Sequence, residues 1–297
     1  MSSGLALIDK PAGWTSHDVV AKLRGVAGTR RVGHAGTLDP MATGLLVIGI
    51  DSGTKLLTFI VGQDKTYEAT IRLGAATITD DAEGEVTDFG SLADCSIERI
   101  REEVARLTGE IDQVPSSVSA IKVDGKRAYA LVRGGDEVKL KSRPVTVSEF
   151  VILGEPREQM LEGHKFLDLD VRISCSSGTY IRALARDLGR ALGSLGHLTS
   201  LRRTRIGGYA VADAQGLEGL SRESLVVTSM REAVSGFELC ELSEQDEIDL
   251  RHGKRISRSA GSLAEVVAGV RGDRVVAMLE PHGQQLKSLV VFAKEEM

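Results

Sequence analysis

The sequence contains no asparagine and only three cysteines. Without asparagine there is no N-glycosylation site. Cys95, Cys175 and Cys240 are far apart and form no Cys-x-x-Cys pair, which excludes a disulfide framework and a cysteine-based zinc site. The six histidines are also scattered, so we expect reduced thiols, no metal ion and a cytoplasmic protein.

Long apolar runs are missing as well. No stretch approaches the roughly 20 residues that span a bilayer, and the amino terminus lacks the basic and then apolar pattern of a signal peptide. We therefore expect no contact with a membrane. The 297 residues suffice for one large domain, or for one large and one small domain.

Positive charge is in deficit overall, with a net charge of −5, but charge is distributed unevenly. Residues 77–113 hold eleven acidic and three basic residues, whereas 176–206 hold six arginines and one acid. Residues 120–143 hold seven basic and three acidic residues. This segregation permits a basic face for a polyanion such as RNA, although such runs are also typical of solvated helix and loop surfaces.

One loop is rich in residues that free or restrict the backbone. The twelve residues from Gly33 to Gly44 include three glycines, one proline and a single acid, Asp39, and an apolar run follows at 45–50. Such a loop can bring main chain close to a bulky ligand while it holds one acid still. The same residues also fit a simple turn that begins at Asp39-Pro40.

The string Gly-His-Ala-Gly-Thr-Leu-Asp-Pro-Met-Ala-Thr-Gly at 33–44 resembles the signature of the TruB-type pseudouridine synthases, which isomerise a uridine in the T arm of tRNA. Three further segments match that family in the same order. They are Lys-Pro-Ala-Gly-Trp-Thr-Ser at 10–16, Lys-Thr-Tyr at 65–67, and Ser-Gly-Thr-Tyr-Ile-Arg at 177–182 followed by Leu-Thr-Ser-Leu-Arg-Arg at 198–203. The resemblance extends from about residue 5 to about residue 209.

We expect an α+β fold with a mixed, mostly antiparallel sheet flanked by helices. The resemblance implies a catalytic domain at 1–235, with a basic, RNA-gripping insertion at about 113–144, and a small β-rich, PUA-like module at 236–297. A small cap that only packs on the core is the alternative for this last part. The family usually has Pro-Pro where this chain has Ser116-Ser117, which should loosen the backbone there.

Hydrophobic periodicity and capping residues predict the individual elements. We expect strands at 5–8, 45–50, 66–73, 145–153, 166–174, 275–279 and 287–292. We expect helices that begin at Thr15 or Ser16 and stop at Gly28, that begin at Asp94 or Ser96 and stop at Gly109, and that cover 55–61, 128–132 and 180–192.

The implied activity is the conversion of uridine to pseudouridine in the T loop of tRNA, at position 55. This isomerisation oxidises nothing and loses no group, so it requires no cofactor, and one carboxylate suffices. Asp39 is the candidate catalyst, whether it attacks C1′ or C6 or accepts the C2′ proton. A buried carboxylate needs a neighbouring cation, and the resemblance implies Arg182, with Arg186 as the second choice.

A base inside a folded RNA arm must be extruded before chemistry, at a cost of a few kcal/mol. By resemblance, His34 fills the hole in the stack, Tyr67 stacks on the extruded uracil and Leu201 forms an apolar wall. Tyr180 is a further candidate for contact with the base or with the Asp39–Arg182 pair. Without the resemblance, each of these residues also fits an ordinary core or loop position.

Basic residues near the matched segments are candidates for contact with RNA phosphates. They are Lys10, Arg30, Arg31, Lys122, Lys126, Arg127, Arg202, Arg203 and Arg205. The expected partner is the T-arm stem-loop of tRNA, bound by a monomer without a guide RNA. The alternative is an RNA-binding, tRNA-folding module in which catalysis is secondary, and which would not need Asp39.

Overall fold

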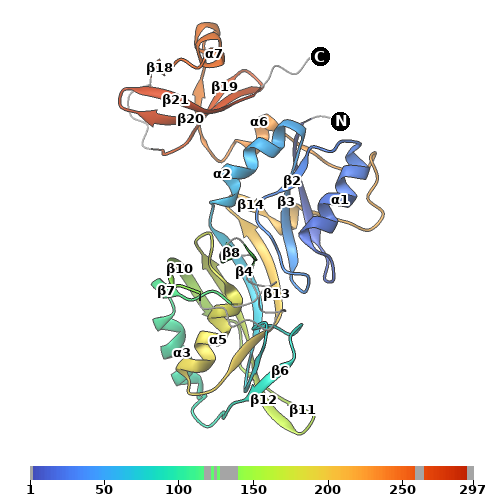
Figure 1. Ribbon diagram of the computed structural model, residues 1–297, viewed down its shortest axis with the longest axis vertical. Helices are drawn as coiled ribbons and strands as arrows, with labels where there is room; N and C mark the ends of the chain where they lie inside the picture. Colours follow the sequence, from blue (N-terminus) through green and yellow to red (C-terminus); the bar gives the residue numbers. More distant parts are fainter. Residues whose placement is uncertain (1–2, 117–121, 124–125, 128–139, 258–263, 293–297) are drawn as a thin grey trace.

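The computed structural model describes residues 3–116, 122–123, 126–127, 140–257 and 264–292 (Figure 1). A 12-stranded sheet forms the body, with the central order β15-β1-β3-β13-β4-β12-β10-β7. Along this path lie β15 (Gln215–Gly216), β1 (Gly4–Lys10), β3 (Thr43–Ile50), β13 (Gly196–Ile206), β4 (Lys65–Leu73), β12 (His164–Cys175), β10 (Arg143–Ile152) and β7 (Gly109–Gln113). Four short strands pair beside it, namely β2 (Val32–His34), β11 (Arg157–Leu161), β14 (Tyr209–Ala210) and β16 (Thr228–Ser229).

Most pairings in this sheet are antiparallel, and the mixed α+β architecture is confirmed. Helices α3 (Ile97–Arg106) and α5 (Ile181–Ala191) pack on one half of the sheet, and α1 (Ser16–Ala27) packs on β1 and β3. Two short hairpin strands, β5 (Ala75–Thr77) and β6 (Val86–Phe89), lie around the start of the acidic stretch and were not among the predicted strands.

A separate five-stranded sheet ends the chain, next to α2 (Leu57–Val61) and α6 (Met230–Ala233) in Figure 1. Its strands are β17 (Glu238–Glu241), β18 (Ile256–Ser257), β19 (Val267–Arg271), β20 (Arg274–His282) and β21 (Gln285–Val291), accompanied by α7 (Glu244–Arg251). Val270, Met278 and Phe292 of this part share one buried cluster with Leu5 and Ile60 of the body. The small sheet is therefore packed on the large one through an apolar interface.

Helix α1 is capped at both ends by residues that lie next to it in the sequence. The hydroxyl of Thr15 accepts the Asp18 N–H at 3.1 Å, and the Asp18 carboxylate accepts the Thr15 N–H at 2.9 Å, which is a complete capping box. Gly28 ends the helix in the left-handed region with φ +68°. The expected helix from Thr15 or Ser16 to Gly28 is confirmed, as is the Ser96 cap of α3.

Other expectations differ in detail. The segment expected as one helix at 55–61 begins in a 3₁₀ helix, η1 (Asp51–Leu56), which continues into α2. A second 3₁₀ helix, η2 (Val211–Asp213), follows β14. Helix α3 ends at Arg106, and the expected stop residue Gly109 instead begins β7 with φ +100°. The helix expected at 128–132 lies outside the described residues.

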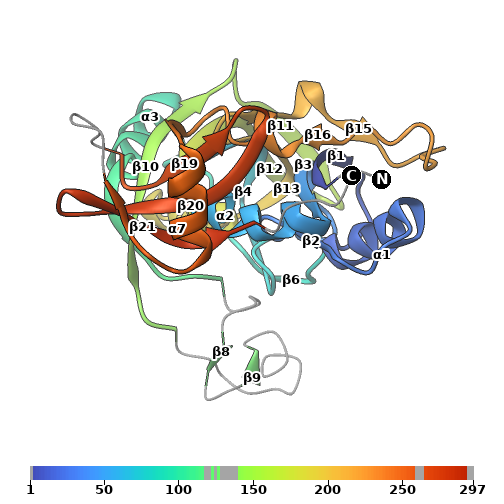
Figure 2. The same ribbon diagram turned by 90° about the horizontal axis from the view of Figure 1, so that it is seen from above.

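Within the basic insertion, β8 (Lys122–Val123) pairs with β9 (Lys126–Arg127), and Figure 2 shows this hairpin standing out from the molecule.

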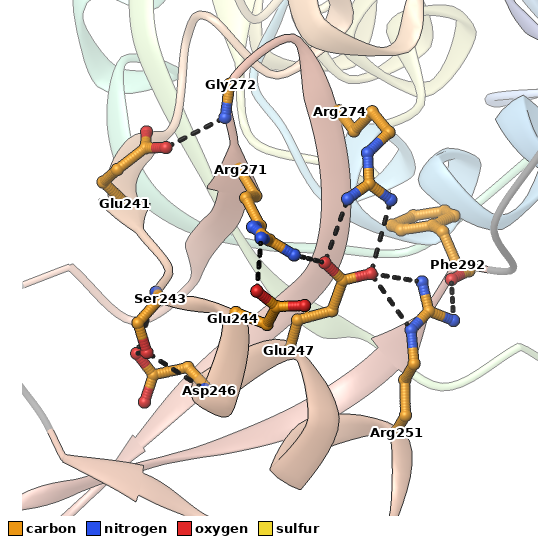
Figure 3. Close-up of polar contacts among 10 residues, drawn as sticks. All are labelled: Glu241, Ser243, Glu244, Asp246, Glu247, Arg251, Arg271, Gly272, Arg274 and Phe292. Atoms are coloured by element: carbon orange, nitrogen blue, oxygen red, sulfur yellow. Dashed lines mark hydrogen bonds and ion pairs between the residues drawn. The ribbon is translucent and has the colours of Figure 1, made fainter.

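A buried carboxylate holds the small sheet to its helix (Figure 3). Glu247 of α7 is 2% exposed and accepts hydrogen bonds from Arg251, Arg271 and Arg274. These bonds, Arg274 first, lower the pKa of Glu247 to about 2 against the opposing effect of burial. Because the folded-state pKa is depressed, this stabilisation is present above the ordinary pKa of 4.5 and is lost as pH falls towards 2.

Glu247→Gln is expected to lower the free energy of unfolding by about 2–3 kcal/mol at pH 7, less than for a fully buried pair because the arginines reach solvent. Thermal unfolding at pH 7 and pH 3 measures this, and the difference from the unsubstituted protein should shrink at pH 3. Glu280→Gln is the control, since Glu280 pairs with Lys287 at an exposed site. Equal losses in the two variants would contradict this assignment.

Candidate active site

The loop that carries Asp39 lies where the two halves of the large sheet meet. Strand β13 pairs with β3 in parallel at only two positions, Arg202–Thr43 and Arg203–Gly44, before the strands separate. Residues 35–42 connect β2 to β3 beside this junction. Gly44 has φ +99°, and a Cβ there would lie 2.3 Å from the carbonyl oxygen of Arg203, so no other residue fits.

The Lys-Pro-Ala-Gly-Trp-Thr-Ser motif at residues 10–16 holds the main chain on both sides of Asp39. The Ser16 hydroxyl, on a residue 1% exposed, accepts the Leu38 N–H at 2.9 Å and donates to the Leu38 carbonyl at 3.2 Å. The Pro40 carbonyl accepts from the Gly13 N–H at 2.8 Å and from Lys10 Nζ at 3.2 Å. The main chain before and after Asp39 is thereby fixed. The side chain of Asp39 takes no part in these bonds.

Two residues expected to contact phosphates are instead buried inside this framework. Arg203 is 1% exposed, and its guanidinium donates to the carbonyls of Gly36 and Leu45. Lys10 is 0% exposed and donates to the carbonyls of Trp14 and Pro40. The prediction was wrong for both, because their donors are used to satisfy buried main-chain oxygens of the loop.

Arg182 is the cation that faces Asp39. Its Nε lies 3.0 Å from Asp39 Oδ2, and its side chain is 7% exposed while that of Asp39 is 37% exposed. Arg186, the second choice, lies 3.3 Å from Asp80 and donates to the carbonyl of Val114. The structure therefore separates the two arginines, and the carboxylate of Asp39 is held by a buried guanidinium yet remains accessible to a ligand.

Asp81 completes this arrangement, and the sequence did not single it out. Its Oδ2 lies 3.5 Å from Arg182 Nε, and the residue is 2% exposed. The Thr79 hydroxyl and the Glu83 N–H both donate to Asp81 Oδ1. Asp81 is one of eleven acids in its segment, and only the β5–β6 hairpin, which brings it beside β13, distinguishes it.

The charges around Asp39 are mixed. Burial, followed by the charges of Asp81 and Asp39, raises the pKa of Glu83. Burial lowers the pKa of Lys10 to about 8, which the nearby Glu83 and Asp39 partly offset. Asp39 thus lies among two cations, Arg182 and Lys10, and two further acids, in a region of reduced solvation where these interactions are strengthened.

An apolar surface lies next to this ion pair. Tyr67 and Leu201 are both 7% exposed and share a cluster with Leu38 and Ala42, which flank the Asp39 turn. Burial raises the pKa of Tyr67, and the charge of Asp39 contributes in the same direction. The structure therefore brings together Asp39, Arg182, Tyr67 and Leu201.

His34 lies at the start of the same loop, in β2. Burial and then the charge of His17 lower its pKa, so the imidazole is neutral at pH 7. Its ring meets that of His17 edge to face, with centroids 5.7 Å apart, and its buried Nδ1 has no hydrogen-bond partner among the described residues.

Tyr180 immediately precedes α5. Its ring lies under the guanidinium of Arg143, 4.8 Å from the ring centroid. Tyr180 also contacts the side chain of Gln113 and the Leu184 N–H, and its contact with the base or with the Asp39–Arg182 pair stays a prediction.

The remaining candidate phosphate contacts are dispersed. Arg30 and Arg31 are exposed, and Arg31 pairs with Asp51 at 3.0 Å. Arg202 and Arg205 pair in register with Glu68 and Thr66, on either side of Tyr67, so they point to the opposite face of the sheet. Arg202 also pairs with Asp9 at 2.7 Å. Lys122, Lys126 and Arg127 lie in β8 and β9, and their side chains are outside the described part.

No group of three or more His, Cys, Asp or Glu side chains within the described ranges is arranged to hold a metal ion. No helix in that part of the chain is long and apolar enough to cross a membrane.

Comparison with known proteins identifies the family of this chain. Residues 24–181 match the model of the TruB family pseudouridylate synthase N-terminal domain, and residues 182–241 match the tRNA pseudouridylate synthase B C-terminal domain. The chain belongs to the TruB family. A relative from Leifsonia xyli, named tRNA pseudouridine synthase B, is 54% identical over 303 residues, covering 100% of this chain and 99% of the relative. One of the same name from Thermobifida fusca is 49% identical, covering 99% of both.

Solved structures support the fold of this TruB family member. The chain superimposes on a chain of a Cbf5-Nop10-Gar1 complex with a TM-score of 0.70 at 23% identity, covering 98% of this chain and 85% of that one. A chain from an H/ACA RNP bound to a substrate RNA containing 2′-deoxyuridine also gives 0.70, at 22% identity, covering 99% and 86%. At this level of identity the likeness concerns architecture alone.

Proposed function

We propose that this protein isomerises a uridine in the T loop of tRNA, at position 55, and that it does so as a monomer without a guide RNA. Full-length relatives at about half identity are named tRNA pseudouridine synthase B. The observation that carries the proposal is the Asp39–Arg182 contact of 3.0 Å beside the Tyr67–Leu201 surface. A protein that only binds RNA needs no such accessible, fixed carboxylate.

The reaction breaks the N1–C1′ bond, rotates the freed uracil and forms a C5–C1′ bond, while C5 loses a proton and N1 gains one. Asp39 is the group that acts on the nucleoside, and Arg182 pairs with it at 3.0 Å, next to the buried Asp81. The framework of Ser16, Gly13 and Lys10 supplies the fixed geometry that makes one carboxylate effective.

Extrusion of the uridine requires replacement contacts. Tyr67 offers a ring for stacking, worth roughly 1–3 kcal/mol in other aromatic–base contacts. Leu201 closes the apolar side of the site, and the neutral His34 occupies the space that the base leaves in the RNA stack. Tyr180, with Arg143 on its ring, adds a contact at the start of α5.

Phosphates are then bound by Arg30, Arg31 and the basic residues of the β8–β9 hairpin. The division we propose is a catalytic domain at 1–235 and a small RNA-binding module at 236–297. Because phosphate contacts release counterions, the logarithm of the affinity for tRNA should fall linearly with the logarithm of the salt concentration.

The test uses the purified full-length protein and a tRNA transcript, with no other macromolecule. Carbodiimide labelling and primer extension locate each pseudouridine. We expect one product, at position 55, and none in a transcript with cytidine there. Modification at another position would overturn the proposed site. Modification that requires an added RNA would overturn the proposal that no guide is needed.

Ser16→Ala is expected to lower kcat about tenfold while the Kd for tRNA changes less than twofold. Its hydroxyl satisfies two buried main-chain groups of Leu38, so its loss lets the Asp39 turn shift. Multiple-turnover kinetics at saturating tRNA and filter binding measure the two quantities. Ser221→Ala, at an exposed turn, is the control, and an unchanged kcat in Ser16→Ala would refute the positioning role.

A further inference from the structure

A buried glutamine outside the site contacts the element that carries Arg182. Gln113 is the last residue of β7 and is 1% exposed. Its Oε1 accepts the Tyr180 N–H at 2.8 Å, and its Nε2 donates to the Tyr180 carbonyl at 3.0 Å. One side chain therefore satisfies both main-chain groups of a single residue, as a neighbouring strand would.

Tyr180 is the N-cap residue directly before α5, and its side chain makes no capping hydrogen bond. Its carbonyl also accepts the Leu184 N–H at 3.2 Å, the first bond of the helix. Arg182 is only two residues further along the chain. Gln113 thus fixes the position from which the Arg182 side chain extends towards Asp39.

A second contact fixes the rotation of the same helix. The carbonyls of Val114 and Pro115, directly after Gln113, accept from Arg186 at 2.7 and 3.5 Å. Arg186 lies four residues after Arg182 and therefore about one turn further along α5. Residues 113–115 therefore hold α5 at two points, Tyr180 and Arg186. These contacts restrict both translation of α5 along its axis and rotation about it.

We propose that Gln113 is a positioning residue for the isomerisation, which sets the Arg182 guanidinium against Asp39 through the start of α5. The proposal rests on the proposed function. A side chain that only satisfied buried main chain would affect stability and leave the turnover of the folded protein unchanged. The two roles therefore predict different kinetics.

The first test is the single-turnover rate of Gln113→Ala on a tRNA transcript at saturating protein. We expect a loss of about 10–100-fold, the size expected for a displacement of about 1 Å at a reacting centre, with the Kd for tRNA within twofold. Gln113→Glu keeps the acceptor for the Tyr180 N–H but places a carboxylate oxygen against the Tyr180 carbonyl, so it should also lower the rate. It takes the place of Gln113→Ala if that variant does not fold.

The matched control is Gln215→Ala. The Gln215 carboxamide also joins a main-chain N–H and a carbonyl, those of Val226 and Ser224, at 2.8 and 2.9 Å. This variant should lose thermal stability and retain the rate within twofold. If Gln113→Ala behaves in the same way, the positioning role is overturned.

A double-mutant cycle identifies the residue through which Gln113 acts. In an Arg182→Lys background, Gln113→Ala should cost less than threefold, because the guanidinium that it positions is already absent. An undiminished loss there would overturn the proposal. If the unsubstituted protein makes no pseudouridine at position 55, the proposed function fails instead, so the two failures are distinguishable.

Discussion

Asp39→Asn is expected to abolish pseudouridine formation, with a loss of at least about 10⁴-fold, because the amide keeps the shape of the side chain but is neither a nucleophile nor a base. The Asp39 turn is held through main-chain bonds to Leu38 and Pro40, which the substitution leaves in place. Affinity for a T-arm stem-loop should therefore remain within about tenfold. Single-turnover kinetics and filter binding give both values.

Asp170→Asn is the matched control. Asp170 also pairs with an arginine, Arg157, but it lies in register with Thr70 on the face of the sheet opposite Tyr67. Its loss should leave turnover within twofold. Retained turnover in Asp39→Asn would defeat the catalytic assignment, and a loss of RNA affinity equal to the loss of rate would make Asp39 a binding residue.

Arg182→Met should lower kcat by about 10²–10³-fold, the cost typical of removing one preorganised electrostatic partner from a reacting centre. Without the guanidinium, Asp39 and the buried Asp81 are left without the cation that they share. Arg182→Lys should recover part of the rate, because lysine restores the positive charge but lacks the planar guanidinium group with its several donors. Rates are measured on protein shown to be folded by circular dichroism.

Arg172→Met provides the comparison for that experiment. Arg172 pairs with Glu149 at a half-exposed site on strand β12, in register with Glu68. We expect a small loss of stability and no change in kcat. An Arg182→Met protein with full activity would show that the ion pair is structural and that Asp39 acts alone.

Local chemistry explains which elements the sequence predicted. Helix α1 has its capping box and its terminal glycine within the segment itself, and β4 alternates Tyr67, Ala69 and Ile71 on one buried face. The Asp39 loop was identifiable because Gly36 and Gly44 have positive φ, a requirement that glycine meets. Such signals do not depend on distant parts of the chain.

Strand β13, the centre of the sheet, was not predicted. Two register shifts, between Leu198 and Ser200 and between Arg203 and Arg205, interrupt its alternation, and its arginines resemble a solvated surface. Arg203 was misinterpreted for the same reason, because nothing local shows that buried carbonyls from another loop surround it.

The roles of Asp81 and Gln113 also depend on tertiary contacts. Asp81 reaches Arg182 only because the β5–β6 hairpin folds against β13, and Gln113 reaches Tyr180 across 67 residues. A resemblance to a family supplies the catalytic residues that lie within its motifs. It does not supply the residues that hold those motifs in place, which pairing and packing determine.

The most direct test of this account is a crystal structure of Asp39→Asn bound to a T-arm stem-loop that contains the unmodified uridine. We predict a uridine turned out of the loop, its ring against Tyr67, with ribose C1′, ribose C2′ or uracil C6 about 3–3.5 Å from the residue 39 side chain. A uridine that remains stacked in the RNA, or that binds away from Arg182, would contradict the account.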